Sequence, residues 1–301
     1  MSVSIVTPNF NNARFVEQWI RPLLDDPAIT EVVVYDNGST DGSPEMIEAL
    51  GKSKVRLIRG KKNLGATLGR HEAVLASANA LICYLDGDDF LGDQAVGKAL
   101  DALRRDDLDI ALFRCFDVDS DGSNPRIVIP APDQPIDGRS ACALTLGGWH
   151  IHGWGVVRKQ VYLDAWRGFR VHGFLSDEVH LRRMFLASRR VGPSDGDMFY
   201  RRVPKQYDPD RMIDWGRTNV RALALAVDAQ LAADAVRGQL KLTVRFLFGL
   251  TRRALYGNYP RPRVGHLLDE YFSIDARWRP ADAPWFAVDR LLRAARPLLN
   301  D

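Results

Sequence analysis

The sequence predicts an α/β fold, in which a mostly parallel sheet is flanked by helices, followed by a C-terminal helical extension. Short continuous apolar runs alternate with amphipathic stretches through the first half of the chain. This alternation is typical of parallel strands that are covered by helices on both faces. From about residue 205 the pattern becomes helical, with Ala, Leu and Arg dominant.

Each element follows from a local signal, taken in chain order. Apolar runs predict strands at 3–6, 31–35, 55–58, 81–85 and 110–116, and amphipathic stretches predict helices at 13–24, 44–50, 66–78 and 93–105. Ser43 is expected to cap the second helix, with Pro44 at its first position. Residues 117–138 predict an irregular loop around a strand at 126–129, and the stretch after it mixes helix and strand.

The predicted domain boundary falls at residue 204. Residues 1–204 are expected to form one α/β domain with halves 1–116 and 117–204, and residues 205–301 are expected to form the helical extension. The 301 residues are 46% hydrophobic and 26% charged, which is the composition of a globular protein with a sizeable core.

Charge and cysteine content narrow the class of protein. The formal net charge of +3 is too small to indicate a nucleic-acid partner. The cysteines, Cys83, Cys115 and Cys142, are odd in number and form no CxxC motif, so we expect buried thiols in a reducing compartment. The sequence shows no signal-peptide pattern and no apolar run of about 18 residues, so the predicted location is the cytoplasm.

Polar loops follow four consecutive predicted strands, and such loops meet at one rim of a parallel sheet. They contain Thr7-Pro8-Asn9-Phe10-Asn11, the run from Asp36 to Ser43, Asn63-Leu64-Gly65 with Arg70 beyond it, and Asp86-Gly87-Asp88-Asp89. The loops supply small residues for close approach, Asn and Asp for base and ribose, an arginine for phosphate, and carboxylates for Mg²⁺ or Mn²⁺. Together they predict a nucleoside-diphosphate site.

Parts of these loops also fit other interpretations. An acidic run after a strand is also typical of a solvated Asp-Gly turn. A Rossmann dinucleotide site is disfavoured because no GxGxxG follows the first strand, and the sequence contains no P-loop motif.

The four motifs resemble, in order and spacing, those of family-2 inverting glycosyltransferases of the GT-A fold. The matching segments are 4–11, 34–43, 63–70 and 84–89, and the resemblance covers about residues 3–204. It implies a nucleotide-sugar-binding half at 1–116 and an acceptor half at 117–204. Asn37 stands where many members have Asp, and His71 stands where Asn often follows the arginine, so the base and the sugar stay open.

The resemblance implies a role for each donor-site residue. Asp36 would hydrogen-bond the nucleobase, Arg70 would approach the diphosphate, and Asp86 would lie near the ribose and the sugar. The implied nucleotide-sugar-binding residues are Thr7, Pro8, Asn9, Phe10, Asp36, Asn37, Gly38, Asn63, Gly65, Arg70, Asp86 and Gly87. The implied ligands of the Mg²⁺ or Mn²⁺ cofactor are Asp88 and Asp86.

Inverting transfer needs a general base for the acceptor hydroxyl. Ser176-Asp177-Glu178 aligns with a Glu-Asp pair that the family places at a helix start. Asp177 is therefore the predicted base and Glu178 the reserve candidate, with Ser176 in place of the usual Glu. The same run also suits an ordinary helix start, with a Ser cap and acids in the first turn.

Trp149, His152 and Trp154 are the candidate acceptor-binding residues. They lie in a stretch rich in Gly, Trp and His that precedes Asp177. Aromatic faces with polar edges suit a sugar, although core tryptophans and a loop histidine explain the pattern equally well.

The helical extension alternates an apolar face with basic residues. Apolar residues recur at 236, 240, 244, 247, 248 and 255, with Arg237, Lys241 and Arg245 on another face, and at 285, 288, 292, 295 and 299, with Arg290, Arg293 and Arg296 opposite. Packing on the α/β domain, or a homodimer contact, is the favoured interpretation. Contact with the inner face of an anionic membrane is the alternative.

The resemblance thus implies a metal-dependent inverting glycosyltransferase that moves a sugar, most simply from a UDP-sugar, to a glycan or lipid-linked glycan in cell-surface polysaccharide synthesis. A sugar nucleotidyltransferase would need a Gly-rich, Arg-containing loop after the first strand, which residues 7–11 are not. The alternative from another class is a non-catalytic scaffold that binds nucleotide-sugars or glycans. The intact pair Asp86 and Asp88 argues against it.

Overall fold

The computed structural model describes residues 1–51, 53–171, 173, 175–201, 208–257, 259–274 and 286–300. The chain divides into two compact units. The first unit comprises residues 1–141, 150–171 and 183–204, and the second comprises 142–149, 172–182 and 205–301. The predicted boundary at residue 204 lies outside the described residues and stays a prediction.

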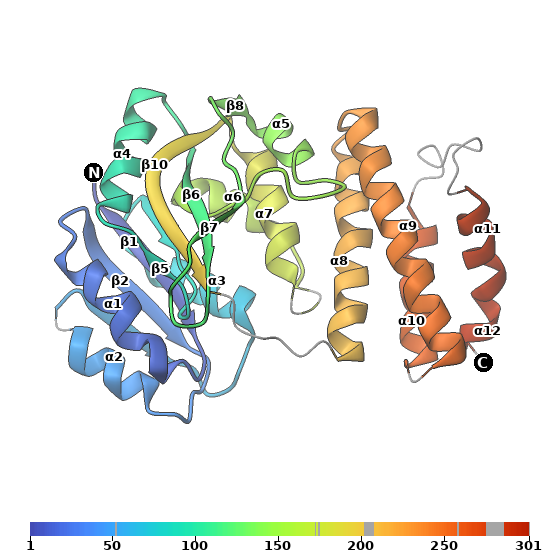
Figure 1. Cartoon of the computed structure of the whole chain (residues 1–301), viewed down its shortest axis with the longest axis horizontal. Helices are drawn as coiled ribbons and strands as arrows, with labels where there is room; N and C mark the ends of the chain where they lie inside the picture. Colours follow the sequence, from blue (N-terminus) through green and yellow to red (C-terminus); the bar gives the residue numbers. More distant parts are fainter. Residues whose placement is uncertain are drawn as a thin grey trace. The chain divides into compact units, whose positions relative to one another are not determined.

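A mixed sheet forms the centre of the first unit (Figure 1). Its strands are β1 (Val3–Asn9), β2 (Ile29–Asp36), β3 (Val55–Arg59), β4 (Leu81–Tyr84), β5 (Phe90–Leu91), β6 (Ile110–Val118), β7 (Arg126–Ile129), β8 (Ile136–Asp137), β9 (Gly155–Arg158) and β10 (Arg190–Arg201). They are ordered β3-β2-β1-β4-β9-β6-β10-β5, with β7 paired to β6 and β8 paired to β10.

The sheet is parallel where the predicted site lies. Strands β1 to β4 pair in parallel, as do β6 and β10. Strand β9 runs antiparallel to both of its neighbours, β4 and β6. The carboxyl ends of β1, β2, β3 and β4 therefore point to the same rim.

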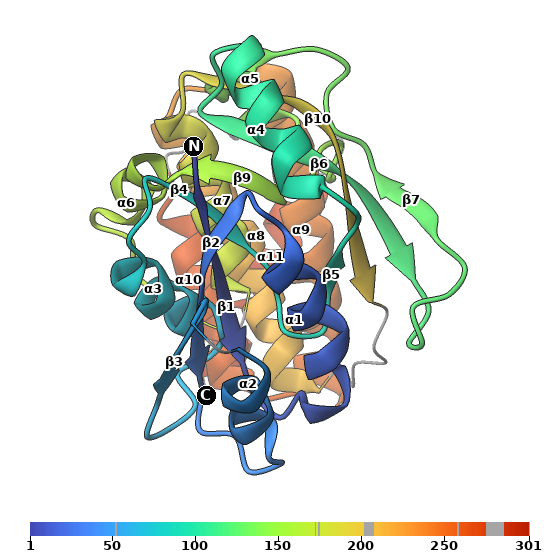
Figure 2. The ribbon, with the colours of Figure 1, turned by 90° about the vertical axis from the view of Figure 1, so that its left-hand side faces the viewer.

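Helices cover the sheet of the first unit. They are η1 (Ala13–Phe15), α1 (Val16–Asp25), α2 (Ser43–Gly51), α3 (Ala66–Ala76), α4 (Ala95–Arg105), α5 (Gly138–Ala143), α6 (Lys159–Trp166) and α7 (Ser176–Ala187), of which α5 and α7 extend into the second unit. Helix α3 packs against β1 and β2, and α4 packs against β6 and β10 (Figure 2).

The apolar runs that predicted strands are buried as expected. Every residue of β1 and of β4 is buried. Trp19 of α1 and Phe113 of β6 belong to the hydrophobic core cluster and are 1% and 0% exposed. Each such side chain stabilises the fold by roughly 1.5–3 kcal/mol, which fixes the strands that carry the loops.

The structure confirms the predicted strands and helices to within a few residues and adds one strand that bears on the site. Strand β5 immediately follows the acidic motif and pairs with Met198 and Phe199 of β10. Two residues are too few to give a periodic signal, so the sequence did not predict it. All three cysteines are buried and free, which confirms the prediction of buried thiols.

The second unit is helical, as predicted. Its helices are α8 (Pro209–Asp228), α9 (Ala233–Tyr256), α10 (Arg261–Phe272), α11 (Phe286–Ala295) and α12 (Pro297–Asn300). The predicted apolar face of α9 is buried, since Val236, Leu240, Val244 and Leu247 are at most 2% exposed. Trp285, which was predicted to share such a face, lies outside the described residues. Within the described ranges, no helix is long and apolar enough to cross a membrane.

Candidate functional site

The loops after β1, β2, β3 and β4 are joined by backbone hydrogen bonds at the predicted rim. Asn37 N donates to Asn9 O at 2.8 Å, Gly60 N donates to Asp36 O at 2.8 Å, and Leu85 N donates to Val6 O at 3.1 Å. Gly60 permits this approach, because a Cβ there would lie 2.6 Å from Asp36 O. The structure thus brings the first two predicted loops together at one edge of the sheet.

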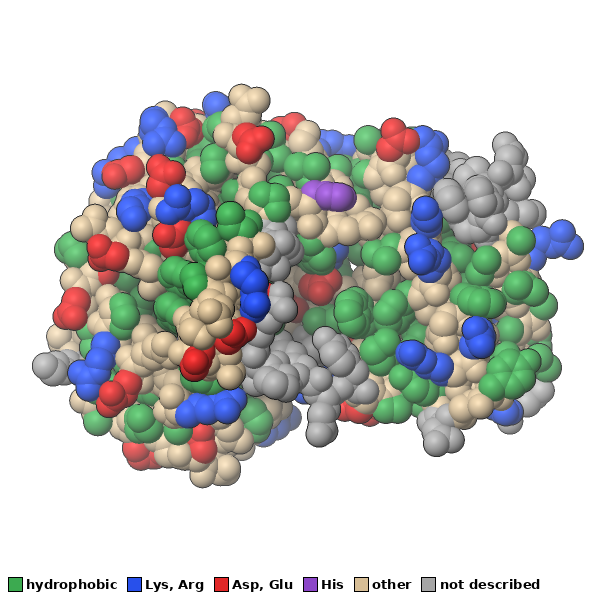
Figure 3. All heavy atoms as spheres, in the orientation of Figure 1, with side chains coloured by type: hydrophobic (Ala, Val, Ile, Leu, Met, Phe, Trp, Pro, Cys, Tyr) green, Lys and Arg blue, Asp and Glu red, His purple; other side chains and the backbone are tan. Residues whose placement is uncertain are grey.

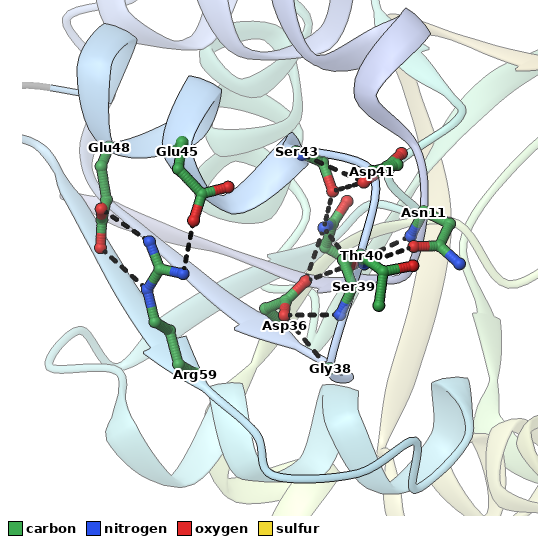
Figure 4. A network of polar contacts seen from close by, with 11 residues as sticks. Asn11, Asp36, Gly38, Ser39, Thr40, Asp41, Ser43, Glu45, Glu48 and Arg59 are labelled. Carbon is green, nitrogen blue, oxygen red and sulfur yellow. Dashed lines mark hydrogen bonds and ion pairs between the residues drawn. The ribbon is translucent and has the colours of Figure 1, made fainter.

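Asp36 is the centre of a polar network in this edge (Figure 4). Its Oδ1 accepts from Asn9 Nδ2 at 2.8 Å and from Ser39 Oγ at 2.5 Å. Its Oδ2 accepts from the backbone N of Gly38 at 3.1 Å and of Ser39 at 3.0 Å. These four donors match the roughly four acceptor positions of a carboxylate, so Asp36 orders the loop that it begins.

The first loop tightens this network. Asn9 Nδ2 also donates to Ser43 Oγ at 2.9 Å, and Thr40 N donates to Asn11 Oδ1 at 2.8 Å. Thr7 and Asn9 are 0% exposed, and Thr7 Oγ1 and Asn9 Oδ1 have no hydrogen-bond partner in the described part of the chain. Buried polar atoms normally have partners, so these two acceptors indicate a place for a ligand or water.

Asn37 holds the third loop. Its Oδ1 accepts from Leu64 N at 3.1 Å, and a Cβ on Gly69 of α3 would lie 2.7 Å from Asn37 Nδ2. Asn63 Oδ1 accepts from Gly65 N at 2.7 Å, and Gly65 has φ +82°, which favours glycine, just before α3. An amide at 37 therefore serves this loop directly, where the family often has a carboxylate.

Arg70 and Asp86 form an ion pair at the same rim. Arg70 Nη2 lies 2.7 Å from Asp86 Oδ1, with side chains 9% and 32% exposed. The Arg70 guanidinium lies 5.4 Å from the ring centroid of Tyr84, and the Tyr84 hydroxyl donates to Gly153 O. An arginine beside a half-buried carboxylate is suited to bind a diphosphate and a hydroxyl-rich sugar.

Arg201 holds the acidic loop and was not identified from the sequence. Its backbone N donates to Asp89 Oδ1 at 2.8 Å, and its Nε donates to Asp88 O at 2.8 Å. The guanidinium lies 4.5 Å from the ring centroid of Phe15 and 5.4 Å from that of Phe90. Burial lowers the pKa of Arg201. A single arginine at a strand end has no pattern that would reveal this role.

Asp86 and Asp88 fit a divalent cation that is shared with a substrate. Both side chains are partly exposed, and the loop lies close to the first strand, since a Cβ on Gly87 would lie 3.4 Å from Asn9 Oδ1. Across the described ranges, no group of three or more His, Cys, Asp or Glu could hold a metal ion. Mg²⁺ is commonly bound by one or two carboxylates plus substrate phosphates, which is the donor set that this loop offers.

Asp177 and Glu178 lie in the second unit, in the first turn of α7. Glu178 Oε2 lies 3.5 Å from Arg182 Nη1, and Arg182 Nη2 donates to Thr145 O at 3.0 Å. Burial raises the pKa of Glu178, and Asp177 raises it further against the opposing effect of Arg182. Glu178 is therefore committed to a buried arginine one turn along the helix.

The three candidate acceptor residues fall in both units. Trp149 belongs to the second unit, where the Arg182 guanidinium lies 4.2 Å from its ring centroid. In the first unit Trp154 lies between His152 and Tyr200, with ring centroids 5.6 Å apart in both pairs. His152 is 1% exposed, and its Nε2 and Nδ1 bond to Phe113 O at 2.8 Å and Trp154 N at 3.1 Å. His152 thus has a structural role in this turn.

A comparison with protein families identifies the family of this chain. The model of Glycosyl transferase family 2 matches residues 4–158, more than half of the chain. The chain belongs to glycosyl transferase family 2. This confirms the family and the enzyme class, a glycosyltransferase, that the four motifs predicted.

Individual relatives of this family-2 protein match different shares of their length. The succinoglycan biosynthesis protein ExoU of Rhizobium meliloti is 33% identical over 100 residues, which cover 33% of this chain and 29% of ExoU. The glycosyltransferase GlyG of Streptococcus pneumoniae is 21% identical over 219 residues, which cover 66% of this chain and 70% of GlyG. The chain thus spans less than a third of ExoU.

The fold is that of a solved glycosyltransferase. The crystal structure of residues 1–349 of S. aureus TarS in complex with UDP-GlcNAc matches with a TM-score of 0.72 at 16% identity, covering 100% of this chain and 89% of that chain. This confirms the GT-A fold class predicted from the sequence.

Proposed function

We propose that this protein transfers a sugar from a nucleoside-diphosphate sugar, most simply a UDP-sugar, to a hydroxyl of a glycan or lipid-linked glycan, with inversion at the anomeric carbon. The observation that carries the proposal is the Arg70–Asp86 pair at the rim shared with the Asp36 loop. Two comparisons support it. TarS has been crystallised with UDP-GlcNAc and with UDP, and ExoU is named for succinoglycan biosynthesis.

The nucleotide is proposed to bind along the first two loops. Phe10 is 43% exposed and offers a ring to the base, while Thr7 Oγ1 and Asn9 Oδ1 offer buried acceptors. A base contact with Asp36 would require one of its four present donors to yield, and the Ser39 hydroxyl is the one that can rotate away.

Arg70 is proposed to move from Asp86 to the diphosphate when the donor binds. Guanidinium groups bind phosphate in two-pronged geometry, and a charge-assisted hydrogen bond of this kind favours the departing nucleoside diphosphate. Asp86 would then be free to accept from donor hydroxyls. Asp88, with Asp86, would hold Mg²⁺ or Mn²⁺, which supplies further neutralisation of the diphosphate charge.

Asp177 is proposed as the general base. The acceptor oxygen forms a bond to the anomeric carbon while the bond from that carbon to the diphosphate oxygen breaks, and the acceptor proton passes to the Asp177 carboxylate. Glu178 is the weaker candidate because it is paired with Arg182 at 3.5 Å. Trp149 and Trp154 remain proposed acceptor contacts, each offering one ring face.

Two sequence predictions about partners remain predictions: self-association, and contact of the basic C-terminal helices with the inner face of a membrane. The scaffold alternative also has a specific feature in its favour, which is Ser176 in place of the usual Glu. Ser176 is buried and its Oγ donates to Gly173 O at 2.6 Å, so it shapes the helix start.

The test is a donor panel of UDP-, GDP- and dTDP-sugars, measured for binding and for release of the nucleoside diphosphate with Mn²⁺ and with chelator. We expect one donor to bind and to be hydrolysed slowly, with Asp88→Asn losing metal-dependent turnover. Asp101→Asn on α4 serves as a charge-matched control outside the site. The proposal fails if no donor binds under any condition, and the scaffold alternative gains if donor binds but no variant of Asp88 or Asp177 changes turnover.

A further inference from the structure

A pocket in the second unit has a composition that the proposed transfer does not explain. It is an open hollow with a volume of about 730 Å³, lined by Met212 of α8 and by residues of α9 that include Arg245, Phe246, Gly249, Arg252 and Tyr256. This volume lies within the roughly 300–1,000 Å³ typical of small-molecule sites. Basic side chains lie among hydrophobic ones over the C-terminal helices on the face shown in Figure 3.

The arginines of this pocket differ from several others in the unit. Arg217, Arg263, Arg293 and Arg296 each pair with a carboxylate, such as Arg217 Nη1 with Asp214 Oδ1 at 3.0 Å. Arg245, Arg252 and Arg253 have no carboxylate partner within the ranges that the structure describes. Within α9 itself, no acidic residue follows Asp234. Three cations thus line one hollow without internal neutralisation.

Helix stability accounts for only part of this charge. Arg252 and Arg253 lie near the C-terminus of α9, where cations interact favourably with the helix dipole. Arg245 lies in the middle of the helix and gains nothing from that effect. Residues 245, 249, 252 and 256 recur at spacings of four, three and four, so they share one face of α9.

Gly249 keeps the middle of this face open. A Cβ at this position would meet no heavy atom within 4 Å, so the helix itself does not require glycine there. Glycine inside a helix is destabilising relative to alanine. A glycine between two arginines without carboxylate partners therefore leaves room for a ligand.

Aromatic rings lie in the pocket and beside it. Phe246 lies 5.6 Å from Trp215 of α8 between ring centroids, and Trp215 is 37% exposed. Tyr256 is 87% exposed at the far end of the same helix face. Large exposed rings beside planar guanidinium groups combine a surface for sugar rings with two-pronged recognition of carboxylate or phosphate.

We propose that this pocket binds an anionic glycan, a sugar chain that carries carboxylate or phosphate groups, through Arg245 and Arg252 with Tyr256 and Phe246 as stacking surfaces. The inference deepens the proposed function by naming the chemical class of the acceptor. Only the statement that the bound glycan is the acceptor rests on that function. A membrane surface fits less well, because a helix lying on lipid presents a continuous apolar stripe and this face alternates Arg with Gly.

The test is titration of the full chain with a hyaluronan octasaccharide, a phosphorylated maltooctaose and neutral maltooctaose. We expect at least one anionic oligosaccharide to bind more tightly than neutral maltooctaose, with affinity that falls as salt is raised. The double variant R245Q/R252Q should bind that oligosaccharide about tenfold more weakly, or more weakly still, as expected for lost charge-assisted hydrogen bonds. UDP binding to the double variant should be unchanged.

Two variants of Gly249 distinguish the effect on binding of filling the pocket from the effect of removing positive charge. Gly249→Leu fills the pocket while keeping every arginine, and it should also weaken binding about tenfold, whereas Gly249→Ala should not. Gly97→Leu is the matched control, because Gly97 is a helical glycine of the first unit that likewise has no heavy atom within 4 Å of a Cβ. Circular dichroism confirms that each variant is folded.

The inference is overturned if neither anionic oligosaccharide binds better than maltooctaose, or if R245Q/R252Q and Gly249→Leu bind like the wild type. It is also overturned if phosphatidylglycerol vesicles sediment the protein and the oligosaccharides do not bind. Loss of donor turnover across the whole panel, with oligosaccharide binding intact, would contradict the proposed function and leave this site in place.

Discussion

Replacing Arg201 tests whether a buried arginine holds the acidic loop in place. The Arg201 side chain donates to Asp88 O at 2.8 Å, to Ser120 O at 2.8 Å and to Gln18 Oε1 at 2.5 Å, and the residue is 2% exposed. Arg201→Met keeps the stem and removes all three donors. Because the acceptors are partly exposed and can bind water, the loss is that of charge-assisted hydrogen bonds, and we expect the free energy of unfolding of the first unit to fall by about 1.5–3 kcal/mol.

The assay is urea unfolding followed by tryptophan fluorescence, together with donor turnover. Arg21→Met on α1 is the matched control, since Arg21 pairs with Glu17 at 3.4 Å and its side chain is 59% exposed. That control should change stability by no more than about 0.5 kcal/mol. Turnover of Arg201→Met should fall about 10²-fold, because a misplaced Asp88 loop misplaces the diphosphate. Equal unfolding midpoints for the two variants would refute the reasoning.

Three further predictions concern the site and its surroundings. Gly69→Ala places a Cβ 2.7 Å from Asn37 Nδ2 and should weaken UDP binding about tenfold. The control Gly97→Ala has open space around the Cβ, so it should leave the free energy of unfolding unchanged or raise it by about 0.5–1 kcal/mol. Equal UDP affinities of the two variants in a titration would contradict this reasoning. Asp177→Asn should lower kcat by roughly 10²–10⁴-fold with little change in donor KM, and the reverse ranking with Glu178→Gln would move the base to Glu178. Burial lowers the pKa of His152 to about 4. Below pH 6.5 the folded state therefore binds fewer protons than the unfolded state, so the free energy of unfolding should fall as the pH falls from about 6.5 to 4. His152→Gln should flatten that pH dependence of the urea midpoint, and an unchanged slope would argue against it.

The structure confirms many of the local signals of the sequence. The apolar run at 31–35 predicted β2, and Val32, Val33 and Val34 are 0% exposed, because a strand covered on both faces must be apolar throughout. The four polar loops predicted a common rim, and the ion pair between Arg70 and Asp86 shows two of them in contact. These predictions needed only periodicity, turn chemistry and the rule that parallel strands end together.

Residues far apart in the chain decided the rest. Asp88 and Arg201 are 113 positions apart, and no local pattern announces that one holds the other. Glu178 is predicted from its helix position, yet its pairing with Arg182, and that arginine's bond to Thr145, depend on packing against another segment. The sequence by itself determined the family, the strands and the chemistry of the loops, because those depend on neighbours along the chain. Tertiary structure alone decided which polar groups are satisfied internally and which still offer an acceptor, as Thr7 Oγ1 and Asn9 Oδ1 do, because burial and hydrogen bonding depend on neighbours in space.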